Sequence, residues 1–158
     1  MTDEKKRDFT LKISQANKTA LISILYDIGI AYIDEATETI AAGDQKGFRI
    51  AVERIRSTIH ELMNSVNSQT ELGRTFMRLY IFANCQLTKA FIDYDAKPLE
   101  PVKRMFTQLS ESYVTLAASD NSGPVMENTE NVYEGFTYNR NLKNENVADI
   151  NSSRGFYV

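Results

Sequence analysis

The stretch LYDIGIAYIDEA, residues 25–36, decides the fold, because it holds more apolar residues than a single helix face can use. Apolar residues recur in it at steps of three and four, which predicts a helix, at Leu25, Ile28, Tyr32 and Ala36. Other apolar residues widen this stripe on both sides, namely Ile24, Ala31 and Ile33. A stripe this wide indicates that the helix packs against at least two partner helices.

The boundaries of this helix follow from the residues around it. Asn17 is a good N-cap, since its side-chain oxygen accepts from free backbone amides, and the helix is expected to run from about residue 18 to 42. Gly43 is expected to end it in the left-handed conformation. Asp44 is then the expected cap of a second helix that extends to Val66.

Two more helices are expected downstream, at about residues 70–94 and after Pro98. Pro98 and Pro101 fit a first helical turn, where a missing N–H costs little.

The second helix has its apolar stripe at Phe48, Val52, Ile55, Ile59, Leu62 and Val66. The stripe of the third is Leu72, Phe76, Leu79, Ala83, Leu87, Ala90 and Tyr94. That of the fourth is Leu99, Val102, Phe106, Leu109, Tyr113 and Leu116. Four amphipathic helices with short connections predict an all-α, antiparallel up-down four-helix bundle with a C-terminal extension.

Three regions are expected along the chain. Residues 1–16 form an N-terminal segment in which Phe9, Leu11 and Ile13 alternate, so that it either lies extended in a groove or frays. Residues 17–118 form the bundle. Residues 119–158 form a polar tail dotted with aromatic residues, including Tyr133, Phe136, Tyr138, Phe156 and Tyr157. The tail either stays solvated or folds back over the bundle and competes with its ligand, in which case deleting residues 125–158 tightens binding.

Composition excludes several classes of function. The 158 residues carry a net charge of −3 with scattered basic residues, which argues against nucleic-acid binding. No window is apolar enough for a membrane span, and the start lacks the apolar run of a signal peptide. A single cysteine gives no sign of an oxidising compartment. The cytoplasm is therefore the expected location.

Catalytic and metal chemistry find no support in the sequence. A di-metal site in a bundle needs Glu-x-x-His pairs, whereas the one histidine, His60, follows Ser57 at that spacing and is expected at the surface or its boundary. Cys85 has no basic neighbour to activate it and is interpreted as a small core or boundary residue. The adjacent Asp34 and Glu35 point in different directions and are expected in solvent. No phosphate-binding glycine loop is present. We therefore expect no enzyme, no metal and no cofactor.

A surplus of apolar side chains remains after the core stripes are assigned. Residues outside the narrowest stripes are Ile22, Ile30, Ile33, Ile81, Phe82, Phe91 and Ile92. Either all of them are core, or some line an exposed groove for a partner segment.

Several segments resemble the FliS family of flagellin-specific export chaperones. ALISILYDIGIAYIDEA is similar to the leucine-tyrosine-aspartate helix of that family, and it is followed by the AGD step at residues 42–44 and by IHELMNSV. RLYIFANCQLTKAFIDYD is similar to the family's leucine-tyrosine helix. The resemblance covers roughly residues 17–113. Lys18 and Tyr113 depart from the proline and tryptophan usual in the family, and Phe9 is only a near substitute for a groove-occupying N-terminal tyrosine.

The resemblance implies a cytoplasmic chaperone that binds the disordered C-terminal segment of flagellin, prevents premature polymerisation and assists delivery to the flagellar type III export apparatus. Flagellin would be the main partner, and export-gate and other flagellar proteins further ones. The residues expected to form or support the flagellin groove are Ile22, Tyr26, Ile33, Tyr80, Phe82 and Phe91. Residues that could occlude this groove are Phe9, Phe136, Tyr138, Phe156 and Tyr157. The alternative is a non-enzymatic adaptor or regulatory bundle that binds another folded protein.

Overall fold

A computed structural model describes residues 1–126, and all regular structure in this part is helical. The helices are α1 (Asp3–Gln15), α2 (Lys18–Ala41), α3 (Gln45–Asn64), α4 (Glu71–Asp93) and α5 (Leu99–Ala117). The predicted all-α class and helical bundle agree with this arrangement. The described residues contain five helices, however, and not the four that were predicted.

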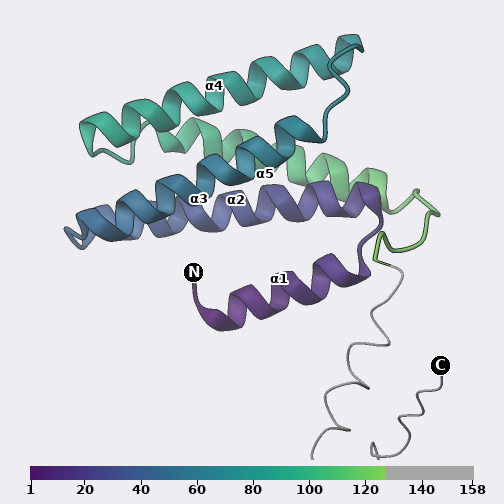
Figure 1. The fold of residues 1–158 in the computed structure, drawn as a ribbon, viewed down its shortest axis with the longest axis horizontal. Helices are drawn as coiled ribbons and strands as arrows, with labels where there is room; N and C mark the ends of the chain where they lie inside the picture. Colours follow the sequence, from purple (N-terminus) through teal and green to yellow (C-terminus); the bar gives the residue numbers. More distant parts are fainter. Residues whose placement is uncertain (127–158) are drawn as a thin grey trace, which may run out of the picture. The chain divides into compact units, whose positions relative to one another are not determined.

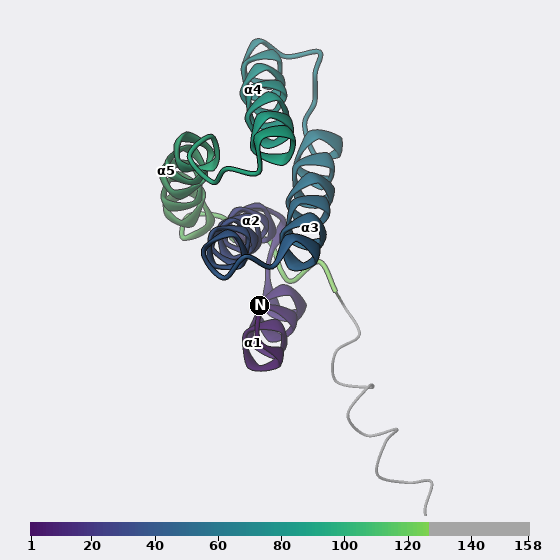
Figure 2. The same cartoon turned by 90° about the vertical axis from the view of Figure 1, so that its left-hand side faces the viewer.

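Helices α2 to α5 are joined by short loops and run back and forth beside one another (Figure 1). Seen along the helices, α2 lies between α3 and α5, and α4 lies across from it (Figure 2). The backbone of α2 adjoins α1, α3 and α5, whereas the backbone of α4 adjoins only α3 and α5 among the described helices. Helix α2 is therefore the most enclosed element, as its wide apolar stripe predicts.

The predicted caps explain where the helices begin and end. Asn17 Oδ1 accepts from the Ala20 amide at 2.8 Å, and Asp44 Oδ1 accepts from the Gly47 amide at 2.9 Å. Gly43 has a φ of 70°, the left-handed conformation expected after a helix. The expected helix boundaries are therefore confirmed to within about two residues.

The main core lies between α2, α3, α4 and α5, and it contains most of the predicted stripe residues. Its largest fully buried side chains include Tyr26, Phe48, Tyr80 and Phe106. Two predicted stripe residues, Leu72 and Leu116, are instead exposed by 67% and 55%. Leu72 lies in the first turn of α4 and Leu116 in the last turn of α5, where a helix has neighbours on fewer sides.

Gly29 brings α5 close to α2. A Cβ at this position would lie 2.7 Å from Phe106 Cε2 and 2.9 Å from Phe106 Cδ2, both on a fully buried ring. Only glycine therefore leaves room for the Phe106 ring, which packs 5.4 Å from that of Tyr26.

The expectation of an extended or frayed N-terminal segment is wrong, because residues 3–15 form helix α1. Thr2 caps this helix, and the two acidic residues in its first turn interact favourably with the positive end of the helix dipole. Phe9 and Ile13, four residues apart, pack on α2, whereas Leu11 between them is 53% exposed. Apolar residues therefore recur here with a helical period, and Leu11 made the pattern look like alternation.

The chain after α5 returns to the junction between α1 and α2. Asn17 Nδ2 donates to the Asp120 carbonyl at 3.0 Å, and Thr19 Oγ1 donates to the Asp120 carboxylate at 2.5 Å. The Val125 amide donates to the Ala16 carbonyl at 3.0 Å. These three bonds fix residues 120–125 beside the start of α2.

Candidate binding surface

Tyr26 of α2 and Tyr80 of α4 meet in the centre of the bundle. Their hydroxyl oxygens are 2.6 Å apart, and the residues are 0% and 1% exposed. Phe76 and Tyr113 surround the pair, with ring centroids 6.2 Å from Tyr80 and 5.8 Å from Tyr26 respectively. The two tyrosines, both predicted to belong to the groove or its support, therefore contact one another inside a closed aromatic cluster.

Burial keeps both hydroxyls of this pair protonated. It raises the pKa of Tyr26 far above the ordinary tyrosine value and raises the pKa of Tyr80 to about 12. Removing water raises the pKa because it disfavours the charged phenolate. At neutral pH the pair is thus a neutral hydrogen bond that joins α2 to α4.

Two other predicted groove residues lie on α2. Ile33 is 2% exposed and belongs to the main core. Ile22 is half-buried and packs against the edge of that core. Of the α2 residues predicted for the groove, only Ile22 therefore offers a contact surface in this arrangement.

Phe82 and Phe91 lie on opposite sides of α4, since they are nine residues apart and each residue turns the helix by about 100°. Phe82 is 40% exposed. Phe91 is half-buried beneath the Arg49 guanidinium, whose carbon lies 5.6 Å from the ring centroid. The structure thus joins Tyr26 to Tyr80 but separates Phe82 from Phe91.

Phe9 packs on α2 and is 8% exposed, within a small cluster that also contains Ile24 and Ala31. This cluster lies under α1 and is separate from the main core. The other residues expected to occlude a groove lie outside the described residues, namely Phe136, Tyr138, Phe156 and Tyr157.

Helix α4 carries exposed apolar residues both in its middle and next to its C-terminal end. Ile81 and Ile92 are 52% and 73% exposed, and Phe82 lies beside Ile81. All three had been singled out as lying outside the narrowest stripe. Their position on the outside of α4 depends on which helices adjoin it, which periodicity alone does not reveal.

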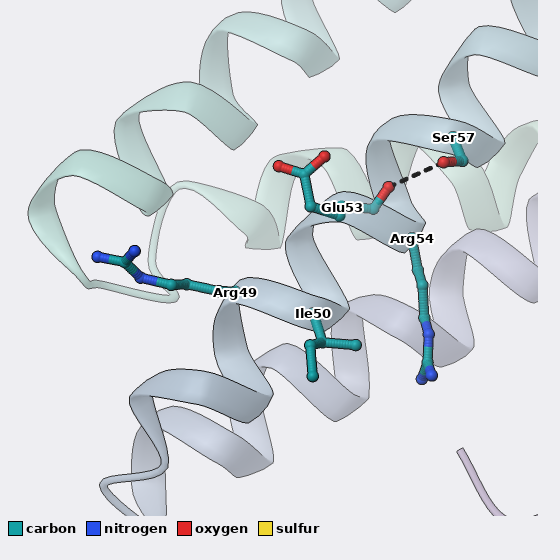
Figure 3. Close-up of a pocket in the computed structure, with 5 residues that line it drawn as sticks. All are labelled: Arg49, Ile50, Glu53, Arg54 and Ser57. Atoms are coloured by element: carbon teal, nitrogen blue, oxygen red, sulfur yellow. Dashed lines mark hydrogen bonds between the residues drawn. The ribbon is translucent and has the colours of Figure 1, made fainter.

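A shallow hollow of about 330 Å³ on the outside of α3 was not anticipated from the sequence (Figure 3). Residues of α3 alone line it, with Ile50 flanked by Arg49 and Arg54 and with Glu53 and Ser57 beyond. Arg54 is already engaged, since its Nη1 lies 3.3 Å from a Glu35 carboxylate oxygen. The hollow is an open surface without a set of converging polar groups.

The polar residues weighed for chemistry lie apart from these surfaces. Cys85 is exposed, so its interpretation as a core or boundary residue is wrong; it lies on the outward side of α4. His60 is exposed, as expected, and its ring nitrogen Nδ1 lies 3.2 Å from Asn64 Nδ2. Asp34 and Glu35 were expected in solvent, but both form ion pairs. Asp34 pairs with Lys103 at 2.6 Å, and Glu35 pairs with Arg54.

In residues 1–126, no three His, Cys, Asp or Glu side chains cluster in a way that suits a metal ion. No helix in this same part has the length and hydropathy needed to cross a membrane.

A closed aromatic core and a surplus of apolar side chains on the outer helices define a helical-bundle protein suited to binding other proteins. The family model described as "Flagellar protein FliS" matches residues 1–121, and the chain belongs to this family. The resemblance drawn from the sequence is thereby confirmed. Membership supports a flagellar chaperone role, in a family that is generally non-enzymatic. No curated protein matched the chain.

Proposed function

We propose that this protein binds the disordered C-terminal segment of flagellin in the cytoplasm, prevents its premature polymerisation and assists its delivery to the flagellar type III export apparatus. The observation that carries the proposal is the apolar surface of α4. Ile81, Phe82 and Ile92 are exposed there and do not belong to the buried core. Family membership supports a flagellar partner for this surface.

The physics of capturing a disordered segment favours such a surface. A segment that orders on binding loses conformational entropy, and extended apolar contact must offset that loss. Exposed apolar residues along a helix provide contact of this kind, whereas an enclosed pocket would not admit a long chain. In this proposal the exposed Phe82 contacts flagellin, the half-buried Phe91 and Ile22 add contacts on other sides of the bundle, and the buried Tyr26, Ile33 and Tyr80 support them.

Calorimetric titration of the full-length protein with full-length flagellin tests the proposal. We expect association with a large negative heat-capacity change, because apolar surface is buried. Flagellin that lacks its C-terminal segment should not bind, and the isolated segment should bind. Absence of association with folded chaperone would refute the proposal. Binding that persists without the C-terminal segment would instead favour an adaptor for a folded partner.

A substitution links the expected binding to the surface. Phe82→Ala should weaken flagellin binding about tenfold, a typical cost for truncating an aromatic contact residue. Ile50→Ala is the matched control, because Ile50 is exposed to a similar degree, 43% against 40%, but lies on α3. Equal effects of the two substitutions would count against the assignment of Phe82.

A further inference from the structure

Cations outnumber carboxylates on α4. The helix contains the cations Arg74, Arg78 and Lys89, and its two carboxylates, Glu71 and Asp93, are its first and last residues, although the whole chain carries a net charge of −3. All three cations are exposed. Within residues 1–126 none of them forms an ion pair; Arg74 donates to the Gln69 carbonyl and Arg78 to Thr75 Oγ1.

These cations share one side of the helix with exposed apolar residues. At about 100° per residue, seven side chains fall within roughly a quarter of the circumference. They form what we call the α4 outer face: Glu71, Arg74, Arg78, Ile81, Cys85, Lys89 and Ile92. The opposite side of α4 holds Tyr80, Leu87 and Ala90, all buried in the core. Packing within the bundle therefore does not account for Ile81 and Ile92, which are 52% and 73% exposed.

We propose that the α4 outer face docks an amphipathic helical segment of a partner protein that carries apolar residues flanked by carboxylates. The apolar side chains of such a segment cover Ile81 and Ile92, and its carboxylates meet Arg74, Arg78 and Lys89. The proposal goes beyond flagellin binding because it rests on the cations of this face, although Ile81 and Ile92 also belong to the proposed flagellin surface, so the two partners would compete for α4.

Charge decides against two other occupants. A symmetric pairing of two copies through this face would oppose cations to cations, because the face carries three cations and one carboxylate, Glu71. An anionic membrane surface would attract the three cations, but it would also repel a chain of net charge −3. A single acidic segment satisfies the face without either conflict.

The test uses a fluorescein-labelled 18-residue helical peptide, with leucines at helical spacing and flanking glutamates, titrated into the full-length protein. We expect saturable binding by fluorescence anisotropy that weakens as salt rises. The triple variant R74E/R78E/K89E should bind at least tenfold more weakly. The matched control K46E/K97E/R104E reverses three exposed cations outside α4, so it changes the net charge equally and should bind like the parent protein.

A second peptide, with lysines in place of the glutamates, should not bind. Circular dichroism verifies that each variant is folded, and the substituted side chains all point to solvent. Three results would each overturn the proposal: equal binding of the acidic peptide to both triple variants, no binding to the parent protein, or binding of phosphatidylserine vesicles without binding of the peptide. Self-association in ultracentrifugation that I81D/I92D abolishes would likewise assign the face to a second copy.

Discussion

The buried bond between Tyr26 and Tyr80 should determine the stability of the bundle in a non-additive way. Tyr26→Phe removes one hydroxyl and leaves that of Tyr80 without its partner at a site that is 1% exposed. An unsatisfied buried hydroxyl costs about 1–3 kcal/mol. Tyr80→Phe should cost a similar amount for the same reason. The double variant removes both hydroxyls together, so it should be less destabilised than either single variant.

Urea unfolding followed by circular dichroism measures these differences. With a slope of about 1–3 kcal/mol per molar urea, each single substitution should lower the midpoint by roughly 1 M. The double variant should recover most of that shift, which corresponds to a coupling energy between the two hydroxyls that exceeds the cost of either single substitution. Tyr32→Phe is the control, since Tyr32 is only half-buried and its hydroxyl is outside this pair; it should change the midpoint little.

The reasoning fails if the double variant loses as much stability as the two single variants combined. Additivity would mean that each hydroxyl contacts another group, so that the 2.6 Å bond does not couple them. Single variants as stable as the parent would show that the lone hydroxyl reaches water. Either result would mean that the cluster around Tyr26 is more open than the structure shows.

Three further perturbations have expected outcomes. Gly29→Ala should destabilise the protein by about 1–3 kcal/mol in thermal or urea unfolding, because the new Cβ meets the buried Phe106 ring. The pKa of Tyr80 is about 12 in the folded protein and about 10 in the unfolded chain, so the contribution of this group to stability is complete below pH 10 and is lost as the pH rises towards 12. Urea midpoints should therefore fall between pH 10 and 12. They should fall less in the double Phe variant. Hydrogen bonds from Thr19 and Ser122 lower the pKa of Asp120 to about 2 from 3.8, so its contribution is present above pH 4 and is lost as the pH falls towards 2. Asp120→Ala should therefore speed amide exchange at Val125, and an unchanged exchange rate would show that these bonds do not hold the segment.

Helix boundaries could be predicted from the sequence because caps are local. Asn17 and Asp44 bind amides only three residues away, and Gly43 takes a conformation that its own lack of a side chain permits. The required information therefore lies within one turn of each helix end. Helix α1 was missed by the same local reasoning, because the exposed Leu11 between Phe9 and Ile13 mimics the alternation of a strand.

The candidate surface could be predicted only in part, because exposure depends on how many helices surround each element. Helix α2 contacts α1, α3 and α5, so its surplus apolar residues are covered and Ile33 is 2% exposed. The backbone of α4 adjoins only α3 and α5 among the described helices, so a comparable surplus leaves Ile81, in the middle of α4, 52% exposed.

The same sequence feature therefore has two different meanings in this bundle. A wide apolar stripe on α2 indicates an enclosed helix, whereas on α4 it indicates a surface available to a partner. Charge distinguishes the two cases better than hydropathy does. The exposed outer side of α4 carries Arg74, Arg78 and Lys89 among its apolar residues, while α2 carries no cation after Lys18. Cations interspersed with surplus apolar residues thus identify the helix whose outer side faces solvent, and this is the pattern that an acidic partner segment would recognise.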